Sequence, residues 1–317
     1  MFKYDTPQKV YEIGRAKVGG NPGEYPTVLA GSIFYANQKG VFASKEDGDK
    51  GIFNKEAAEK LIRTQEEMSD MTGNKIWVQI MAETDESMIK YIEWYASVGK
   101  DAFLVDSSAA SAKITGAKRA DEIGLSDRVI YNSINAAAQQ AELDAIKPLK
   151  FTSCIVLGFN PMDMSVKGRM EMLTKGGAGQ TKGMLTLATE KGITRPLIDV
   201  AATSLGSGSG STYRSIFAVK SQLGEPVGGG YHNIPDAWVW LKKYKQQPGH
   251  EKAMKPAAIG SNLIAITLGC NYCLYGPIAG APDLFPAVAM NDIIVEEAAK
   301  EMGTAFLTDV LPLTKLV

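Results

Sequence analysis

Short apolar runs alternate with amphipathic segments about eight times along the chain, and this rhythm constrains the fold more than any other feature. Strands that alternate with helices form βαβ units and a parallel sheet. We therefore expect strands at 27–34, 76–81, 102–105, 129–131, 154–159, 196–200, 226–230 and 272–275. The helices are expected near 54–72, 85–97, 108–123, 137–146, 166–190, 213–223, 236–244 and 283–301. Eight such units predict an α/β fold of the closed (β/α)8 TIM-barrel type, with a three-layer Rossmann-like sheet as the alternative.

The segment before the first repeat has a different pattern. Residues 10–19 form two short alternating runs around Gly14, which predicts a β-hairpin ahead of the barrel. No linker rich in proline, glycine and serine divides the chain, and its composition does not shift. We expect residues 1–317 to form one domain, with residues 1–26 as its N-terminal hairpin extension.

Composition narrows the classes of function. The net charge is −1 and the pI about 6.2, so no basic field indicates a nucleic acid or an anionic membrane surface as partner. Three cysteines in 317 residues favour a reducing compartment. Residues 1–10 lack the apolar core of a signal peptide, and apolar stretches such as 263–268 are far too short to span a membrane. We expect a cytoplasmic protein without membrane insertion.

Polar side chains follow four of the predicted strands at the point where each apolar run stops. They are Asp106, Asn132 with Asn135, Asp199, and Asn233. Because the carboxyl ends of barrel strands meet at one mouth, these side chains are expected to converge on a small-molecule site. The alternative for Asp106 and Asp199 is a structural role near a helix start, since Ser107 and Ser108 are suitable caps.

The chemistry of these residue types indicates a polar heterocycle. One carboxylate can accept hydrogen bonds from the adjacent ring N–H and amino groups of a pterin, and amides serve groups that both donate and accept. A phosphate would instead need lysine, arginine or a helix N-terminus. Gly229, in a run of three glycines, leaves room for a flat ligand or relieves crowding inside the barrel. His232 either contacts the ligand or packs.

Two motifs resemble functional sites but are interpreted otherwise. Residues 206–210 look like a nucleotide-binding glycine loop, but they do not directly follow the strand that ends at Asp199. Cys270 and Cys273 have C-x-x-C spacing without the second pair that a zinc site needs, and they precede a strand. With two histidines in the chain, we predict no bound metal.

Four strings of residues carry a resemblance to a known family. They are GNPGEYPTVL at 20–29, LVDSS at 104–108, LIDVAA at 197–202 and PVGGGYHN at 226–233. They resemble pterin-binding barrels that exchange methyl groups with corrinoid proteins. The greatest similarity is to the H subunit of tetrahydromethanopterin S-methyltransferase and its bacterial relatives, and it runs from about residue 10 to the C-terminus.

The resemblance implies roles at matching positions. Asp106, Asn132 and Asp199 match residues that hold the pterin, and Asn160 occupies a position where the wider group also has an asparagine. Asn233 matches the residue that hydrogen-bonds near N5, the nitrogen that carries the methyl group, and is the predicted catalytic residue. Asn135, Gly229 and His232 complete the predicted pterin-binding set. Tyr231 and His232 replace the Leu-Ser of the acetogenic enzymes, so the pocket is expected to differ there.

The same resemblance implies partners. The chain has no Asp-x-His-x-x-Gly motif, so the corrinoid is expected on a separate corrinoid protein. The modest charge content favours a mesophile, and tetrahydrofolate, converted to methyltetrahydrofolate, is the predicted pterin. Tetrahydromethanopterin within a larger complex, or a non-catalytic pterin-binding subunit, are the alternatives. Dihydropteroate synthase is disfavoured because its Ser-Arg-Lys element is missing. Relatives suggest a homodimer.

Overall fold

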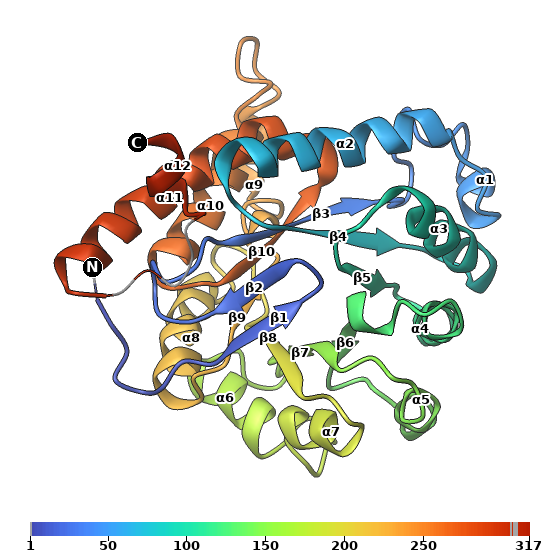
Figure 1. Ribbon diagram of the computed structural model, residues 1–317, viewed down its shortest axis with the longest axis horizontal. Helices are drawn as coiled ribbons and strands as arrows, with labels where there is room; N and C mark the ends of the chain where they lie inside the picture. Colours follow the sequence, from blue (N-terminus) through green and yellow to red (C-terminus); the bar gives the residue numbers. More distant parts are fainter. Residues whose placement is uncertain (1, 305, 307–309) are drawn as a thin grey trace.

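The fold is a closed barrel of eight parallel strands, in the order β10-β3-β4-β5-β6-β7-β8-β9 (Figure 1). The computed structural model describes residues 2–304, 306 and 310–317. The barrel strands are β3 (Val28–Ile33), β4 (Ile76–Met81), β5 (Phe103–Asp106), β6 (Val129–Ile134), β7 (Ser153–Leu157), β8 (Arg195–Asp199), β9 (Val227–Gly229) and β10 (Tyr272–Pro277). Each lies within a few residues of a predicted strand, and the predicted TIM barrel is confirmed.

Helices cover the outside of the barrel. The longer ones are α2 (Lys55–Thr72), α3 (Asp85–Val98), α4 (Ala110–Glu122), α6 (Val166–Thr174), α8 (Ser209–Gln222), α10 (Met254–Thr267) and α11 (Ala281–Glu301). The shorter ones are α1 (Lys45–Asp49), α5 (Gln140–Ile146), α7 (Met184–Glu190), α9 (Val239–Tyr244) and α12 (Pro312–Leu316), with 3₁₀ turns η1 (Ser126–Arg128), η2 (Tyr231–Asn233) and η3 (Ile278–Gly280). The predicted starts of α2 and α3 are capped by Asn54 and Thr84.

The unit between the last two barrel strands differs from its prediction. The helix expected at 236–244 is only the short α9. The long helix of this unit is α10, which was not predicted, because the apolar stretch 263–268 alone does not indicate a helix. The predicted helical segment 166–190 also divides into α6 and α7, with Gly176, Gly177 and Gly179 at positive φ between them. L side chains rarely adopt that backbone region, so glycine ends the first helix there.

The predicted hairpin closes the N-terminal end of the barrel. Strands β1 (Val10–Ile13) and β2 (Ala16–Gly19) pair antiparallel, and Ile13, Ala16 and Val18 pack against the interior residues of the barrel, such as Trp77. A Cβ on Gly14 would lie 2.9 Å from the Ala102 backbone nitrogen, so the turn needs glycine to approach the barrel this closely. The opposite, carboxyl end of the barrel is left as the mouth.

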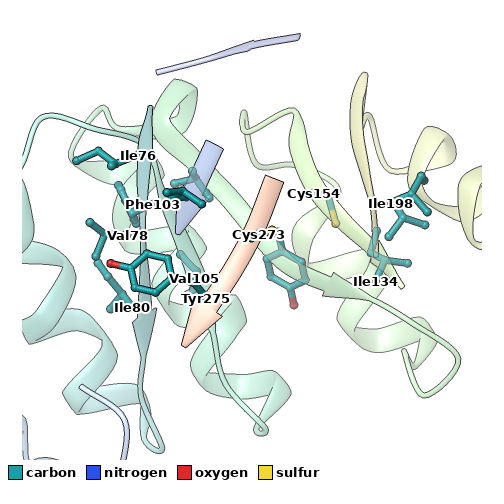
Figure 2. Packing of buried hydrophobic residues seen from close by; sticks show 14 of the residues in the cluster. Ile76, Val78, Ile80, Phe103, Val105, Ile134, Cys154, Ile198, Cys273 and Tyr275 are labelled. Carbon is teal, nitrogen blue, oxygen red and sulfur yellow. The ribbon is translucent and has the colours of Figure 1, made fainter. Parts of the chain in front are cut away.

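Side chains along each strand alternate between two cores. Those that point outward form the larger core beneath the helices, for example Val78 of β4, Val105 of β5 and Ile198 of β8 (Figure 2). Those that point inward, such as Trp77 of β4, fill the barrel. Because the period of a strand is two residues, the inward positions at the carboxyl ends of the strands are fixed by this alternation.

One outer helical segment is apolar enough to cross a membrane by length and composition. It runs from Ile278 to Glu301, through η3 and α11, and half of its most apolar stretch is buried. Inside the fold α11 packs against α2 and α10, and it carries the buried polar residues Asp292 and Glu296. Core helices of globular proteins share this length and composition, so the segment is weak evidence for a membrane span.

Candidate functional site

The predicted carboxylates lie at the mouth because of strand alternation. Leu104 of β5 and Leu197 of β8 point into the barrel, so Asp106 and Asp199, two residues further on, point inward at the mouth. In the register of the sheet Asp106 lies beside Asn132 of β6, and Asp199 lies beside Leu157 of β7. The two carboxylates thus point into the mouth from β5 and β8, which are not neighbouring strands.

A cavity of about 500 Å³ lies at this mouth. Asp106 and Asp199 line it, as do His232 and Asn233 from the segment after β9. Apolar side chains such as Phe159 complete its wall. A concave site with apolar walls and a few convergent polar groups is typical of small-molecule pockets.

Asp106 ends a chain of hydrogen bonds that crosses three strands. The Ser32 hydroxyl donates to Gln79 Oε1 (2.6 Å), and Gln79 Nε2 donates to an Asp106 carboxylate oxygen (2.5 Å). Burial raises the pKa of Asp106, while the Gln79 bond and the charge of Lys113 oppose the rise. Gln79 therefore orients the carboxylate and leaves its second oxygen for a ligand.

Asp199 is buried more deeply. Its Oδ1 accepts a hydrogen bond from the backbone N–H of Ala201 (2.7 Å). Burial raises the pKa of Asp199 to about 6, and the Ala201 bond and the charge of Arg169 work against that rise. Gly229 explains how this carboxylate fits, because its φ is +153° and a Cβ there would lie 2.8 Å from Asp199 Oδ1.

Arg169 of α6 supports the loop that follows Asp199. Its guanidinium is almost wholly buried and donates to Met164 O, Ala201 O and the hydroxyls of Thr203 and Thr212. Burial lowers its pKa. These bonds tie the loop after β7 to the loop after β8, so Arg169 holds the side of the mouth that carries Asp199.

His232 and Asn233 lie in η2, directly after β9. His232 Nδ1 lies 2.8 Å from the carbonyl oxygen of Leu274, which can only accept, so Nδ1 carries the proton and Nε2 is the acceptor when the ring is neutral. Burial lowers the pKa of His232, which favours the neutral ring. Asn233 is exposed at the rim, and among the described residues its side-chain amide has no hydrogen-bond partner.

The other predicted asparagines are placed differently. Asn132 stands beside Asp106 in the register of the sheet, although it does not line the cavity. Asn135 bonds within its own turn, to Ser133 Oγ and the Ala137 N–H. Asn160 is buried and accepts from the Met162 N–H within the loop after β7. The structure thus brings Asp106, Asp199, His232 and Asn233 to one cavity, with Gly229 behind Asp199, and the ligand contacts of all eight predicted residues stay predictions.

Sequence reasoning missed Ser32, Gln79 and Arg169. Ser32 and Gln79 are polar residues inside apolar strands, at inward positions near the carboxyl end, and that pattern was a usable signal. Arg169 sits on an ordinary helix and gave no signal, because all of its partners except Met164 are more than 30 residues away in sequence. Within residues 2–304, 306 and 310–317, no group of three or more His, Cys, Asp or Glu residues is arranged to hold a metal ion.

The fold and the site together define a class of protein: a (β/α)8 barrel whose mouth cavity is lined by two inward carboxylates and an exposed amide. The family model for the tetrahydromethanopterin S-methyltransferase MtrH subunit matches residues 6–307. The chain belongs to this methyltransferase family.

Full-length relatives agree with this assignment. The relative from Methanosarcina acetivorans is 52% identical over 96% of this chain and 95% of its own length. That from Methanothermobacter thermautotrophicus is 49% identical over 98% of each chain. Both are named as the H subunit of tetrahydromethanopterin S-methyltransferase. The family predicted from the four motifs is therefore confirmed.

Solved structures resemble the barrel at much lower identity. Dihydropteroate synthase from Vibrio fischeri has a TM-score of 0.60 at 12% identity, over 91% of this chain and 99% of its own. The Xanthomonas albilineans enzyme in complex with 7,8-dihydropteroate has a TM-score of 0.55 at 14% identity, over 89% and 94% of the two chains. At these identities the likeness shows the fold alone.

Proposed function

We propose that this protein transfers a methyl group between N5 of a tetrahydropterin bound in the mouth cavity and the corrinoid of a separate protein. The observation that carries the proposal is the pair of inward carboxylates, Asp106 and Asp199, which line one cavity of about 500 Å³. A pterin ring presents adjacent N–H and amino donors, and a preoriented carboxylate accepts both.

Tetrahydromethanopterin is the pterin that we propose. The tetrahydrofolate predicted from charge content finds no support in the relatives, whose names carry tetrahydromethanopterin. Charge content reports on growth temperature and says nothing about the ring that the mouth contacts. Relatives that are about 50% identical over their full length are stronger evidence for the pterin than the charge content is.

Asn233 is the residue that we place nearest to the chemistry. Its amide nitrogen lies over Gly230, 3.0 Å from where a Cβ on that glycine would stand, and its amide is free to donate. A hydrogen bond to N5 stabilises the amine as it leaves the methyl group, and the bond strengthens as charge develops on the nitrogen. In the reverse direction N5 attacks as a neutral amine, and positioning supplies the acceleration.

The corrinoid cobalt of the partner would carry the methyl group, and the rim of the mouth supports docking of such a partner. The segments that follow β7, β8 and β9, the last of which includes the start of α9, expose apolar side chains there: Met162, Met164, Leu205, Trp238, Val239 and Trp240. The loops after β8 and β9 are joined by a backbone bond from Leu205 to Ile234. Exposed apolar surface of this kind marks a protein interface.

We further propose that the chain forms a single domain and that the protein is located in the cytoplasm. The homodimer stays a prediction.

The test is a transfer assay with purified protein, a methylated corrinoid protein and each of the two pterins. We expect methyl-tetrahydromethanopterin to form faster than methyltetrahydrofolate. In Asn233→Ala, turnover should fall by more than tenfold with a smaller change in pterin dissociation constant. Gln222→Ala, an exposed amide at the far end of α8, is the matched control.

Two outcomes would contradict the proposal. Absence of product with either pterin removes the enzymatic function and leaves a non-catalytic pterin-binding role as the alternative, which binding without turnover would identify. Equal loss of turnover in the Asn233 and Gln222 variants would remove the role of Asn233.

A further inference from the structure

A second cavity, of about 690 Å³, lies next to the mouth cavity. It is lined by residues from α10, β10, η3 and α11, and His232 lines both cavities. Much of its wall is apolar, with Met254, Ile259, Tyr275 and Leu284 among the lining side chains. His232 therefore stands between the site of the ring and a larger, more apolar space.

Asn262 of α10 adds a buried polar group to this wall. Its side chain is 1% exposed, and its Nδ2 donates to the carbonyl oxygen of Ala258 (3.0 Å). That bond directs Oδ1 away from the Ala258 carbonyl, and Oδ1 finds no donor among the described residues. A buried acceptor without a donor is costly, so a ligand N–H or O–H that reached it would bind with a net gain.

We propose that this second cavity binds the arylamine side arm of the tetrahydropterin whose ring occupies the mouth. This inference rests on the proposed function. The arm leaves a tetrahydropterin from the carbon next to N5, and N5 is placed at Asn233. The adjacent residue, His232, is the wall shared by the two cavities. The aromatic ring of the arm packs on the apolar wall, and a donor of the arm bonds to Asn262 Oδ1.

The charges around the cavity identify which part of the arm is recognised. Lys255 pairs with Asp283 (2.8 Å), and Glu251, Lys252 and Asp236 also line the cavity. Carboxylates slightly outnumber ammonium groups, so the cavity has no excess of positive charge for an anionic end group. Recognition therefore comes from the aromatic ring and its donors, which the two pterins share, and the anionic end extends into solvent.

The test fills the cavity and compares ligands with and without the arm. Gly280 lines it, has negative φ, and a Cβ there meets no atom within 4 Å, so Gly280→Phe places a ring in the cavity without a backbone clash. Gly260 of α10 has equally open space but does not line the cavity, so Gly260→Phe is the matched control. Ala279→Trp, from an exposed lining position, is a second filling variant.

The ligands are tetrahydromethanopterin, tetrahydrofolate and 6-methyltetrahydropterin, which lacks the arm, with binding measured by calorimetry. We expect both filling variants to weaken the binding of the two complete pterins by roughly tenfold or more, because the burial of the arm is lost. The binding of 6-methyltetrahydropterin should be unchanged. Gly260→Phe should bind all three like the unmodified protein.

Each other outcome has a defined meaning. The inference is overturned, while the proposed function stands, if the filling variants bind the complete pterins normally. The same holds if their affinity for 6-methyltetrahydropterin falls as much as their affinity for the complete pterins. If the unmodified protein binds 6-methyltetrahydropterin as tightly as the complete pterins, the arm has no site and the inference is also overturned. If the unmodified protein binds none of the three, the proposed function itself fails.

Discussion

Asp199 is predicted to lower the stability of the protein while it serves the site, and Asp199→Asn tests this. Burial raises the pKa of this carboxyl from 3.8 to about 6. Each unit by which the folded pKa exceeds the unfolded pKa corresponds to about 1.4 kcal/mol. Keeping Asp199 ionised above about pH 8 therefore costs the native state about 3 kcal/mol. Asparagine keeps an oxygen for the Ala201 N–H without the charge. We therefore expect Asp199→Asn to raise the free energy of unfolding at about pH 8.

The sign and the pH window follow from linkage. Because the folded pKa is raised, the native state binds this proton more tightly, and the stability from the protonated form is lost as pH rises through about 6. The gain from Asp199→Asn should therefore be greatest above about pH 7 and fall to roughly one third by about pH 4.5. The new amide must be hydrated in the cavity, so a gain of about 1–3 kcal/mol at high pH is expected.

Urea denaturation of both proteins between about pH 4.5 and pH 8 measures the difference. Burial also raises the pKa values of Asp292, to about 6, and of Glu296, to about 8, but both titrate in each protein and cancel. In the control, Asp163→Asn, hydrogen bonds from Ser165 lower the pKa, so no gain is expected at high pH. A variant that is no more stable at pH 8, or whose gain is independent of pH, would refute the reasoning. Pterin affinity should fall in the same variant, because the charged acceptor is lost.

Three further substitutions test the supports of the site. Gln79→Leu removes the donor to Asp106 and should raise the pKa of that carboxyl further. As the pH is lowered, calorimetric titration should therefore show the loss of pterin affinity at a higher pH than in the unmodified protein. Gly229→Ala brings a Cβ to 2.8 Å from Asp199 Oδ1, and we expect pterin affinity to fall by roughly tenfold with about 1 kcal/mol of destabilisation by urea denaturation. Arg169→Met leaves buried acceptors unpaired and should lower the free energy of unfolding by about 2–3 kcal/mol, whereas an unchanged value would show that Arg169 is not a support.

Much of the fold could be predicted because the barrel depends on local pattern. The apolar runs at 76–81 and 196–200 became β4 and β8 nearly residue for residue, since a buried strand needs only a short apolar run between breakers. The unit after β9 was predicted less well. Its long helix, α10, is apolar along much of its length, including most of the stretch 263–268, so the usual helical period is weak there.

The candidate site divides in the same way. Asp106 and Asp199 were identifiable because each ends a strand, and barrel topology sends strand ends to one mouth. Gln79 and Arg169 were not, because what they do depends on partners from distant segments.

By itself, the sequence determined the number and order of the barrel strands, the hairpin that closes one end, and the family. Hydrophobic periodicity, turn residues and strand-end motifs are local in the chain, and they carry that information directly. Only the tertiary structure decided that Gln79 orients Asp106, that Gly229 makes room for Asp199, and that His232 stands between two cavities. The physical reason is that hydrogen bonds, close approach and enclosed volume arise only when strands and helices distant in sequence are packed together.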